Sequence, residues 1–72
     1  MKKTFGAWTV EVPEDDNTER EYIIECAMTG DVFEDELTHA EAEALVRAYE
    51  AEDRKNGEYT EGFYAIRATS NY

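Results

Sequence analysis

The chain has 72 residues, with 18 Asp and Glu against 7 Lys and Arg, a net charge of -11 and 42% apolar residues. This apolar fraction favours a folded chain, because disordered segments combine high net charge with low hydrophobicity. A chain of this length buries only about 60% of the surface that it exposes when unfolded, which leaves little room for a deep active site. We therefore expect a single domain over residues 1–72 that is not an enzyme.

The sequence also indicates the cellular compartment in which the protein is expected. The one cysteine, Cys26, cannot form an internal disulfide, and no apolar stretch of the kind found in secretion signals follows the basic pair Lys2-Lys3. No apolar run approaches the roughly 20 residues that a membrane span needs. An acidic surface is repelled by nucleic acid and by anionic lipid. We expect a cytoplasmic protein that binds neither membranes nor nucleic acid directly.

Two alternating stretches predict the first strands. Apolar and polar residues alternate from Trp8 to Val12, where Pro13 ends the pattern, and again from Tyr22 to Met28 with Cys26 on the inward face. The connection between these stretches is too short for a crossover helix, so we expect them to pair antiparallel with each other.

After residue 28 the sequence predicts one further strand and leaves one segment open between strand and loop. A Thr-Gly-Asp turn signal at 29–31 precedes Val32 and Phe33, which either begin a short third strand or anchor a loop. Residues 59–68 alternate and are rich in aromatic and β-branched types, which predicts a last strand with Tyr64 and Ile66 inward and Arg67 outward.

One helix is predicted from local signals. Thr38 and Glu41 form a capping box behind Leu37, so the helix should begin at His39 and run to about Lys55, before the stop signal Asn56-Gly57. Its apolar stripe consists of Ala42, Leu45, Val46 and Tyr49. The order ββαβ, or βββαβ if residues 32–36 form a strand, predicts an α+β fold: a small antiparallel sheet of three or four strands with one helix packed across one face.

The other helix face combines alanines with charge pairs. Ala40, Ala44, Ala48 and Ala51 form a smooth stripe, which we interpret as an exposed face in preference to a close packing contact. Glu43 stands four residues before Arg47, and Glu50 four before Arg54, the favourable order for ion pairs along a helix.

The negative charge lies in two blocks. Residues 11–25 carry a net charge of -6 and residues 31–58 carry -7, whereas the first ten residues carry +2. Solubility needs a net charge of only about 2 to 8 in magnitude, so the excess suggests a basic partner, although a solvated surface or adaptation to high salt would also give it. The acids expected at a partner surface are Glu14, Asp15, Asp16, Asp31, Glu34, Asp35, Glu36 and Glu41.

These acids could allow the protein to occupy a DNA-binding site in place of DNA. A groove that holds DNA is lined with Lys and Arg, and a rigid acidic protein can occupy that groove instead. Asp35, Glu36 and Glu41 also lie near the expected helix N-terminus, where the helix dipole favours negative charge and supplies a structural reason for them.

In its length, in the blocks Glu14-Asp15-Asp16 and Asp31 to Glu41, and in its one helix from Thr38 to Gly57 on strands, the chain resembles small acidic phage proteins that inhibit host defence. These are the anti-CRISPR and anti-restriction inhibitors, several of which mimic nucleic acid. The resemblance rests on these general features and not on a motif. It implies a stoichiometric inhibitor in the host-cell cytoplasm, whose partner is the basic nucleic-acid-binding site of a CRISPR effector or a similar enzyme.

Other chemistries fit the sequence less well. Nothing suggests that Cys26 and His39 meet as a nucleophile pair, and residues 14–19 lack the spacing of a calcium-binding EF-hand loop. We expect no catalytic residue, no metal and no cofactor. Trp8, Tyr22, Tyr49 and Tyr64 are expected in the core, whereas Tyr59, Phe63 and Tyr72 are candidates for partner contact. The alternative function is a structural or regulatory interaction module that dimerises through the alanine stripe or a sheet edge, although we expect a monomer.

Overall fold

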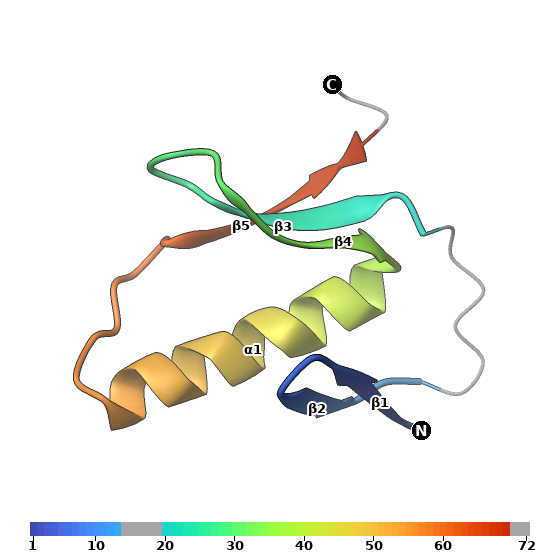
Figure 1. The fold of residues 1–72 in the computed structure, drawn as a ribbon, viewed down its shortest axis with the longest axis horizontal. Coiled ribbons are helices and arrows are strands. Elements are labelled where there is room, and N and C mark those ends of the chain that lie inside the picture. The colour runs from blue at the N-terminus through green and yellow to red at the C-terminus, as the bar shows by residue number, and fades with distance from the viewer. Residues whose placement is uncertain (14–19, 70–72) are drawn as a thin grey trace.

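The structure is a computed structural model, and it describes residues 1–13 and 20–69. In chain order the elements are β1 (Lys2–Phe5), β2 (Trp8–Glu11), β3 (Tyr22–Cys26), β4 (Val32–Leu37), α1 (His39–Lys55) and β5 (Tyr64–Ala68). Figure 1 shows three layers, in which α1 lies between the β1–β2 hairpin and a sheet made of β3, β4 and β5. Three residues predicted at the partner surface, Glu14, Asp15 and Asp16, lie outside the described residues.

The N-terminal segment folds back on itself. β1 pairs antiparallel with β2, with Phe5 opposite Trp8 and Lys3 opposite Val10. The two-residue connection begins with Gly6, whose φ of 64° is the positive value that a tight hairpin turn requires at that position. The predicted pairing of residues 8–12 with residues 22–28 is therefore wrong, because β1, which the alternation analysis did not identify, is the partner of β2.

The three-stranded sheet confirms the predicted fold class, α+β with a small antiparallel sheet and one helix on one face. β3 is central and pairs antiparallel with β4 on one side and β5 on the other. Residues 32–37 form a strand, which settles the choice between strand and loop. The β3–β4 register shifts twice, between Tyr22 and Ile24 and between Ile24 and Glu25, whereas the β3–β5 register is regular.

The second predicted strand ends earlier than expected. β3 stops at Cys26, which is buried as predicted, while Met28 lies in the following turn and is 70% exposed. The turn closes through a hydrogen bond from the Gly30 amide to the Cys26 carbonyl at 2.8 Å, and Gly30 has a φ of 80°. The last strand is also shorter than predicted, since β5 begins at Tyr64.

The helix has the bounds that the sequence predicts. Thr38 caps it in an extended conformation, its hydroxyl accepts from the Glu41 amide, and the Glu41 carboxylate accepts from the Thr38 amide. At the other end Asn56 is the cap and Gly57 has a φ of 72°. Both ends are therefore set by local hydrogen bonds and turn chemistry.

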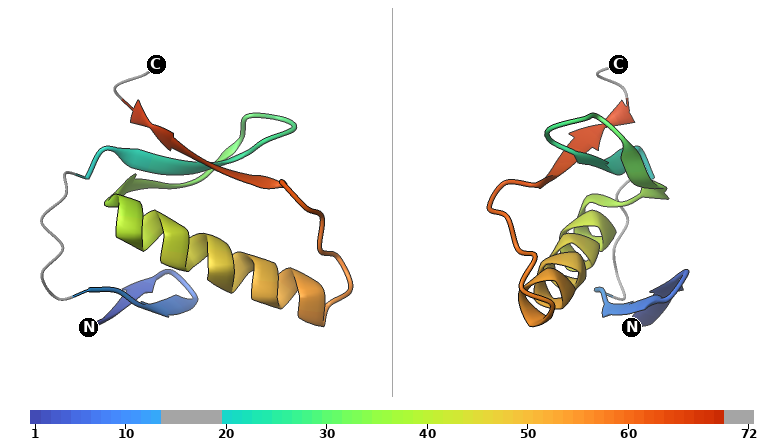
Figure 2. Two further views of the ribbon diagram at one scale, coloured as in Figure 1. Left: turned by 180° about the vertical axis from the view of Figure 1, so that it is seen from behind. Right: turned by 60° about the vertical axis from the view of Figure 1, so that its left-hand side comes forward.

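Helix α1 is covered from two sides (Figure 2). The buried core draws on both β layers and the helix, and it consists of Val10, Val12, Ile24, Leu37, Ala42, Leu45 and Tyr49. Ala44 and Ala48 are half-buried and pack against this core, whereas Ala51 is exposed. The interpretation of the alanine stripe as an exposed face is thus wrong for Ala44 and Ala48, which lie in the packing contact that the sequence left as the second option.

Candidate functional site

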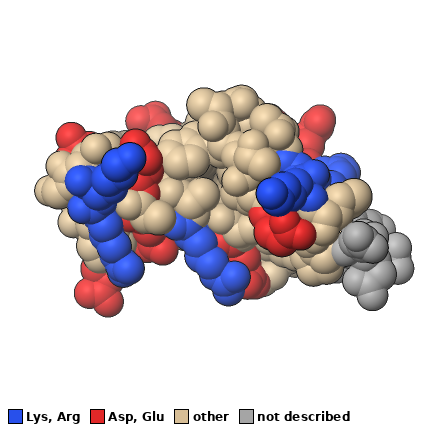
Figure 3. Space-filling view, turned by 90° about the horizontal axis from the view of Figure 1, so that it is seen from below, with Lys and Arg blue, Asp and Glu red and all other residues tan. Residues whose placement is uncertain are grey.

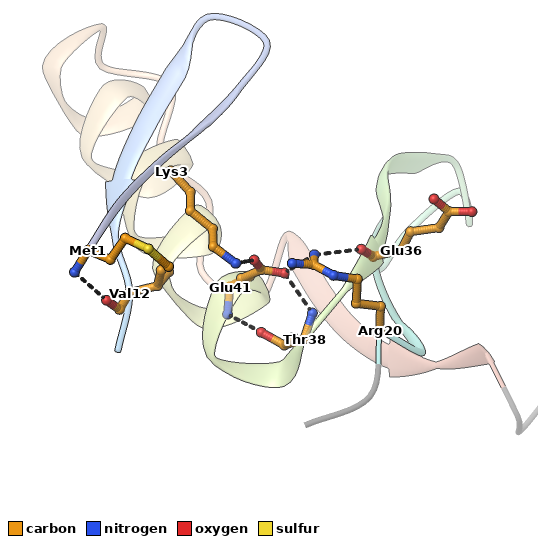
Figure 4. Close-up of polar contacts among 7 residues, drawn as sticks. All are labelled: Met1, Lys3, Val12, Arg20, Glu36, Thr38 and Glu41. Atoms are coloured by element: carbon orange, nitrogen blue, oxygen red, sulfur yellow. Dashed lines mark hydrogen bonds and ion pairs between the residues drawn. The ribbon is translucent and has the colours of Figure 1, made fainter. Parts of the chain in front are cut away.

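Glu41 does not lie on a partner surface. The structure removes it from the predicted acidic surface, because its side chain is fully buried at 0% exposure. An ionised carboxylate is stable in such a place only when charged and hydrogen-bonding partners surround it. Three partners do so in Figure 4, and together with Glu41 they are called the Glu41 junction below: Lys3, Arg20 and Thr38.

The Glu41 junction connects three separate segments of the chain. Lys3 Nζ on β1 donates to Glu41 Oε2 at 2.5 Å, and Arg20 Nη1, just before β3, donates to Oε1 at 2.7 Å. The Thr38 amide also donates to Oε1, at 2.9 Å. The same Arg20 group lies 3.4 Å from the carbonyl oxygen of Glu36 on β4. Glu41 therefore holds the hairpin, the start of the sheet and the helix N-terminus together.

Opposing effects act on the pKa of Glu41. Burial alone would raise the pKa of this carboxyl group, since it disfavours the charged form. The hydrogen bond from Lys3, the bond from the Thr38 amide and the charge of Arg20 favour the charged form, and the net pKa lies below its ordinary value of 4.5. The carboxylate is consequently ionised at neutral pH and acts as a structural anion.

The remaining described acids of the predicted surface lie together. Asp31 precedes β4, and Glu34, Asp35 and Glu36 lie on it; these four residues are called the acidic edge below. Asp31, Asp35 and Glu36 are exposed and Glu34 is half-buried. Within the described part of the chain, none of the four carboxylates forms an ion pair; Asp31 accepts a hydrogen bond from the Thr29 hydroxyl at 3.0 Å.

β4 is a sheet edge, which gives these acids an alternative structural role. Charged side chains on an edge strand hinder pairing with another chain. Glu36 also has a φ of 51°, a left-handed conformation that non-glycine residues rarely adopt. The acidic edge is thus an irregular strand that presents carboxylates to solvent from a defined backbone.

Elsewhere in the described residues some acids are paired and others are not: Glu11, Glu25 and Glu43 form ion pairs, whereas Glu21, Glu50, Glu52, Asp53, Glu58 and Glu61 do not. Glu43 lies 3.7 Å from Arg47, as predicted, and 2.8 Å from His39 Nδ1. The predicted pair of Glu50 with Arg54 is not found in the described residues; the Arg54 guanidinium lies over the Tyr59 ring instead, 4.3 Å from its centroid. Figure 3, viewed from the hairpin side, shows Lys and Arg beside Asp and Glu with neutral surface between them. This face is therefore not uniformly acidic.

An aromatic pocket is the feature of the structure that no sequence pattern indicates. Trp8, Phe33, Tyr49 and Tyr64 line a hollow of about 280 Å³ and are called the aromatic pocket below. The Tyr49 ring is the centre of the group, with centroids 5.0 Å from Trp8, 6.3 Å from Phe33 and 5.2 Å from Tyr64. Trp8, Tyr49 and Tyr64 pack with the core as predicted, but the 43% exposed Phe33 keeps the pocket at the surface.

Phe63 extends this aromatic group. Its ring stacks on Phe33 at 6.1 Å and meets Tyr64 edge-on at 5.0 Å. Of the three aromatic residues predicted to be free for partner contact, Phe63 therefore lies beside the pocket, Tyr59 contacts Arg54, and Tyr72 lies outside the described residues.

Nearby acids help to raise the pKa values of Tyr49 and Tyr64, the two tyrosines that line the aromatic pocket. Tyr64 donates its hydroxyl hydrogen to Asp53 Oδ2 at 2.6 Å. Burial and this hydrogen bond, with smaller effects from nearby charges that include Glu50, raise the pKa of Tyr64 far above its ordinary range. Burial and the charge of Glu34 raise the pKa of Tyr49. Both phenols therefore stay neutral, in a negative electrostatic environment.

Cys26 and His39 have separate surroundings. Hydrogen bonds from the Thr29 side chain and backbone lower the pKa of the Cys26 thiol. His39 contacts Glu43 and lies edge-on to the Tyr22 ring at 5.1 Å. In residues 1–13 and 20–69, no group of three or more His, Cys, Asp and Glu is placed to hold a metal ion.

Comparisons with family models, curated proteins and solved structures find no match to this chain. The one helix of the described residues is too short and too polar to cross a membrane.

Proposed function

We propose that this protein is a non-enzymatic inhibitor, acting in the cytoplasm, that binds the basic nucleic-acid-binding site of a host defence complex such as a CRISPR effector or a restriction-type enzyme. The observation that carries the proposal is the acidic edge, where four carboxylates within six residues of sequence reach solvent without a cationic partner in the described chain. Such a group attracts Lys and Arg side chains that otherwise neutralise phosphates.

The fold adds a reason why this surface would bind well. Three of the four residues of the acidic edge lie on β4, which is paired with β3, and β3 is in turn covered by the capped helix. A surface held in this way loses little conformational entropy on binding, in contrast to a disordered acidic tail. The Glu41 junction keeps β4 and the helix start in fixed relation, since Arg20 contacts both Glu36 and Glu41.

A second candidate function, a protein-interaction module, is favoured by exposed apolar side chains at the same end of the sheet. Met28 is 70% exposed, Val32 54% and Phe33 43%. Dimerisation through the alanine stripe is less well supported, because Ala44 and Ala48 already pack against the core. The two candidates differ in whether charge or apolar contact dominates binding.

The test reverses charge at the acidic edge. A triple variant with Asp31, Asp35 and Glu36 changed to Lys is compared with a control in which the exposed residues Glu52, Glu58 and Glu61 are changed to Lys. Both variants change the net charge by the same amount, so a general charge effect cancels. Binding is measured by surface titration against a panel of CRISPR effectors and restriction enzymes, with and without excess target DNA or RNA, and folding by circular dichroism.

The proposal expects the first variant to lose binding and the control to keep most of it, and it expects nucleic acid to compete with the protein. Equal binding by both variants would contradict charge recognition at the acidic edge. Simultaneous binding of nucleic acid and protein to the target would contradict mimicry. Loss of binding on changing Met28 and Val32 to Ser, with the acids intact, would favour the interaction module.

A further inference from the structure

The aromatic pocket has a size and a chemistry that limit what it can hold. Pockets for drug-sized ligands measure about 300 to 1,000 Å³, so a hollow of about 280 Å³ suits one side chain or a small ion better than a large cofactor. Its walls are aromatic rings from four different elements, β2, β4, α1 and β5. Aromatic ring faces carry partial negative charge and attract cations.

The hydrogen bond that Tyr64 makes favours a ligand that donates hydrogen bonds. Tyr64 has already given its one hydroxyl hydrogen to Asp53, so its oxygen can offer a ligand only acceptor lone pairs. The charges of Glu34, Glu50 and Asp53 act on the pocket phenols from two sides, β4 and α1. In the described chain, none of these three carboxylates is neutralised by an ion pair.

We propose that the aromatic pocket binds the guanidinium group of an arginine side chain, and, resting on the proposed function, that this arginine is presented by the basic nucleic-acid-binding partner. Guanidinium is flat and stacks on aromatic rings, and its five N–H donors can reach more than one carboxylate at once. The chain itself contains the same contact at its surface, where Arg54 lies 4.3 Å from the Tyr59 centroid. The pocket adjoins the acidic edge, because Phe33 lies on β4 beside Glu34, and the charge of Glu34 acts on the Tyr49 phenol inside the pocket.

The pocket contains its own reporter. Trp8 is the only tryptophan of the sequence and lines the pocket, so its fluorescence should respond to a bound ligand. The full chain is titrated with N-acetyl-arginine amide and, separately, with N-acetyl-citrulline amide, which has nearly the same shape but no charge. N-acetyl-lysine amide carries the charge without the flat guanidinium. Amide NMR shifts of Phe33 and Tyr64 provide a second readout.

We expect saturable binding of the arginine compound, weaker binding of the lysine compound and none of the citrulline compound. Phe33→Leu, which keeps an apolar side chain but removes a ring, should weaken arginine binding roughly two- to thirtyfold, the range expected for cation–π contacts. Val32→Ala is the matched control, since Val32 is exposed on the same strand but does not line the pocket. Glu50→Gln tests the charge at the pocket without touching a ring.

Equal binding of arginine and citrulline would overturn the proposal and indicate that the positive charge plays no part in binding. Unchanged arginine binding in both Phe33→Leu and Glu50→Gln would also overturn it and indicate general attraction of cations to an acidic chain. Equal binding of lysine and arginine would overturn the guanidinium assignment. If arginine binds but no nucleic-acid-binding target does, the proposed function fails and the pocket stands. If target binding is lost on charge reversal at Asp31, Asp35 and Glu36 but arginine never binds, only the pocket proposal fails.

Discussion

Lys3 and Glu41 are separated by 38 positions in the sequence, yet their side chains meet at 2.5 Å between the hairpin and the helix. This contact ties the N-terminal layer to the rest of the molecule. Hairpins of two strands are only marginally stable alone, so β1 and β2 depend on packing against α1 and on this ion pair. The stability of the whole chain should therefore respond to Glu41 more than to any exposed acid.

Glu41→Gln should reduce the free energy of unfolding by about 2 to 4 kcal/mol, because Lys3 and Arg20 lose their anionic partner in a buried position. The Lys3 and Arg20 side chains keep 26% and 52% exposure, which holds the loss below that of a fully enclosed ion pair. Urea unfolding followed by circular dichroism measures it. Glu43→Gln on the exposed helix side is the control and should change stability by less than about 1 kcal/mol. Equal effects of the two variants would show that the Glu41 junction contributes no more to stability than an exposed ion pair.

The pH dependence of stability should carry the signature of Glu41. Its folded-state pKa is lowered by Lys3, Thr38 and Arg20 despite burial, so its stabilising contribution is present above the ordinary value of 4.5 and is lost as the pH falls through the folded-state pKa. Protonation of the other acids reduces charge repulsion over the same range, so wild type and Glu41→Gln must be compared. We expect the stability difference between them to shrink below pH 4.5. A difference that stays constant down to pH 2 would contradict an ionised Glu41.

Thr38→Ala should cost about 0.5 to 2 kcal/mol through loss of the helix cap. The Thr38 hydroxyl accepts from the Glu41 amide at 3.2 Å, and alanine has no acceptor to replace it. Thr60→Ala, at an exposed loop position, is the control. Thermal unfolding of both variants decides the point, and unchanged stability of Thr38→Ala would argue against the capping box.

Ala44→Glu should destabilise the fold by about 1 to 3 kcal/mol, because the larger charged side chain must fit where Ala44 packs against the core. Ala51→Glu places the same side chain at an exposed position of the same helix and should be nearly neutral. Sedimentation should give the same mass for wild type and both variants. A wild-type dimer that Ala51→Glu dissociates would instead favour the interaction module.

Binding to a nucleic-acid-binding target should weaken as the salt concentration rises, because ions screen attraction between exposed charges over about 8 to 10 Å. The slope of affinity against salt should be smaller for the variant with Asp31, Asp35 and Glu36 changed to Lys than for the control with Glu52, Glu58 and Glu61 changed to Lys. Surface titration at several salt concentrations provides both slopes. Affinity that is independent of salt would point to apolar recognition.

The features that the sequence predicted correctly are those set by residues close together in the chain. The helix bounds follow from the capping box at Thr38 and from Asn56-Gly57, and both signals act within a few residues. The pairing of residues 8–12 was assigned wrongly because an alternating strand fits any partner with an apolar face. The Gly6 turn was the local signal that could have identified β1.

The site contained contacts that no local pattern reveals. Glu41 belongs to the capping box, but its burial depends on Lys3 and Arg20, which approach only in the folded chain. The aromatic pocket likewise brings together Trp8 and Tyr64, which are 56 positions apart in the sequence. Aromatic residues at strand and helix positions predict a core, and only the fold shows that Phe33 leaves this group open to solvent.

The unequal edges of the three-stranded sheet bear on self-association. β4 departs from regular pairing twice and carries three acids, so it offers a poor template for another strand. β5 pairs in regular register with β3 over Tyr64–Ala68, and its only charged residue is Arg67, which is paired with Glu25. If concentrated protein forms fibrils under destabilising conditions, growth should therefore start along β5, and a proline in place of Ala68, whose amide faces away from β3 in this register, should slow it.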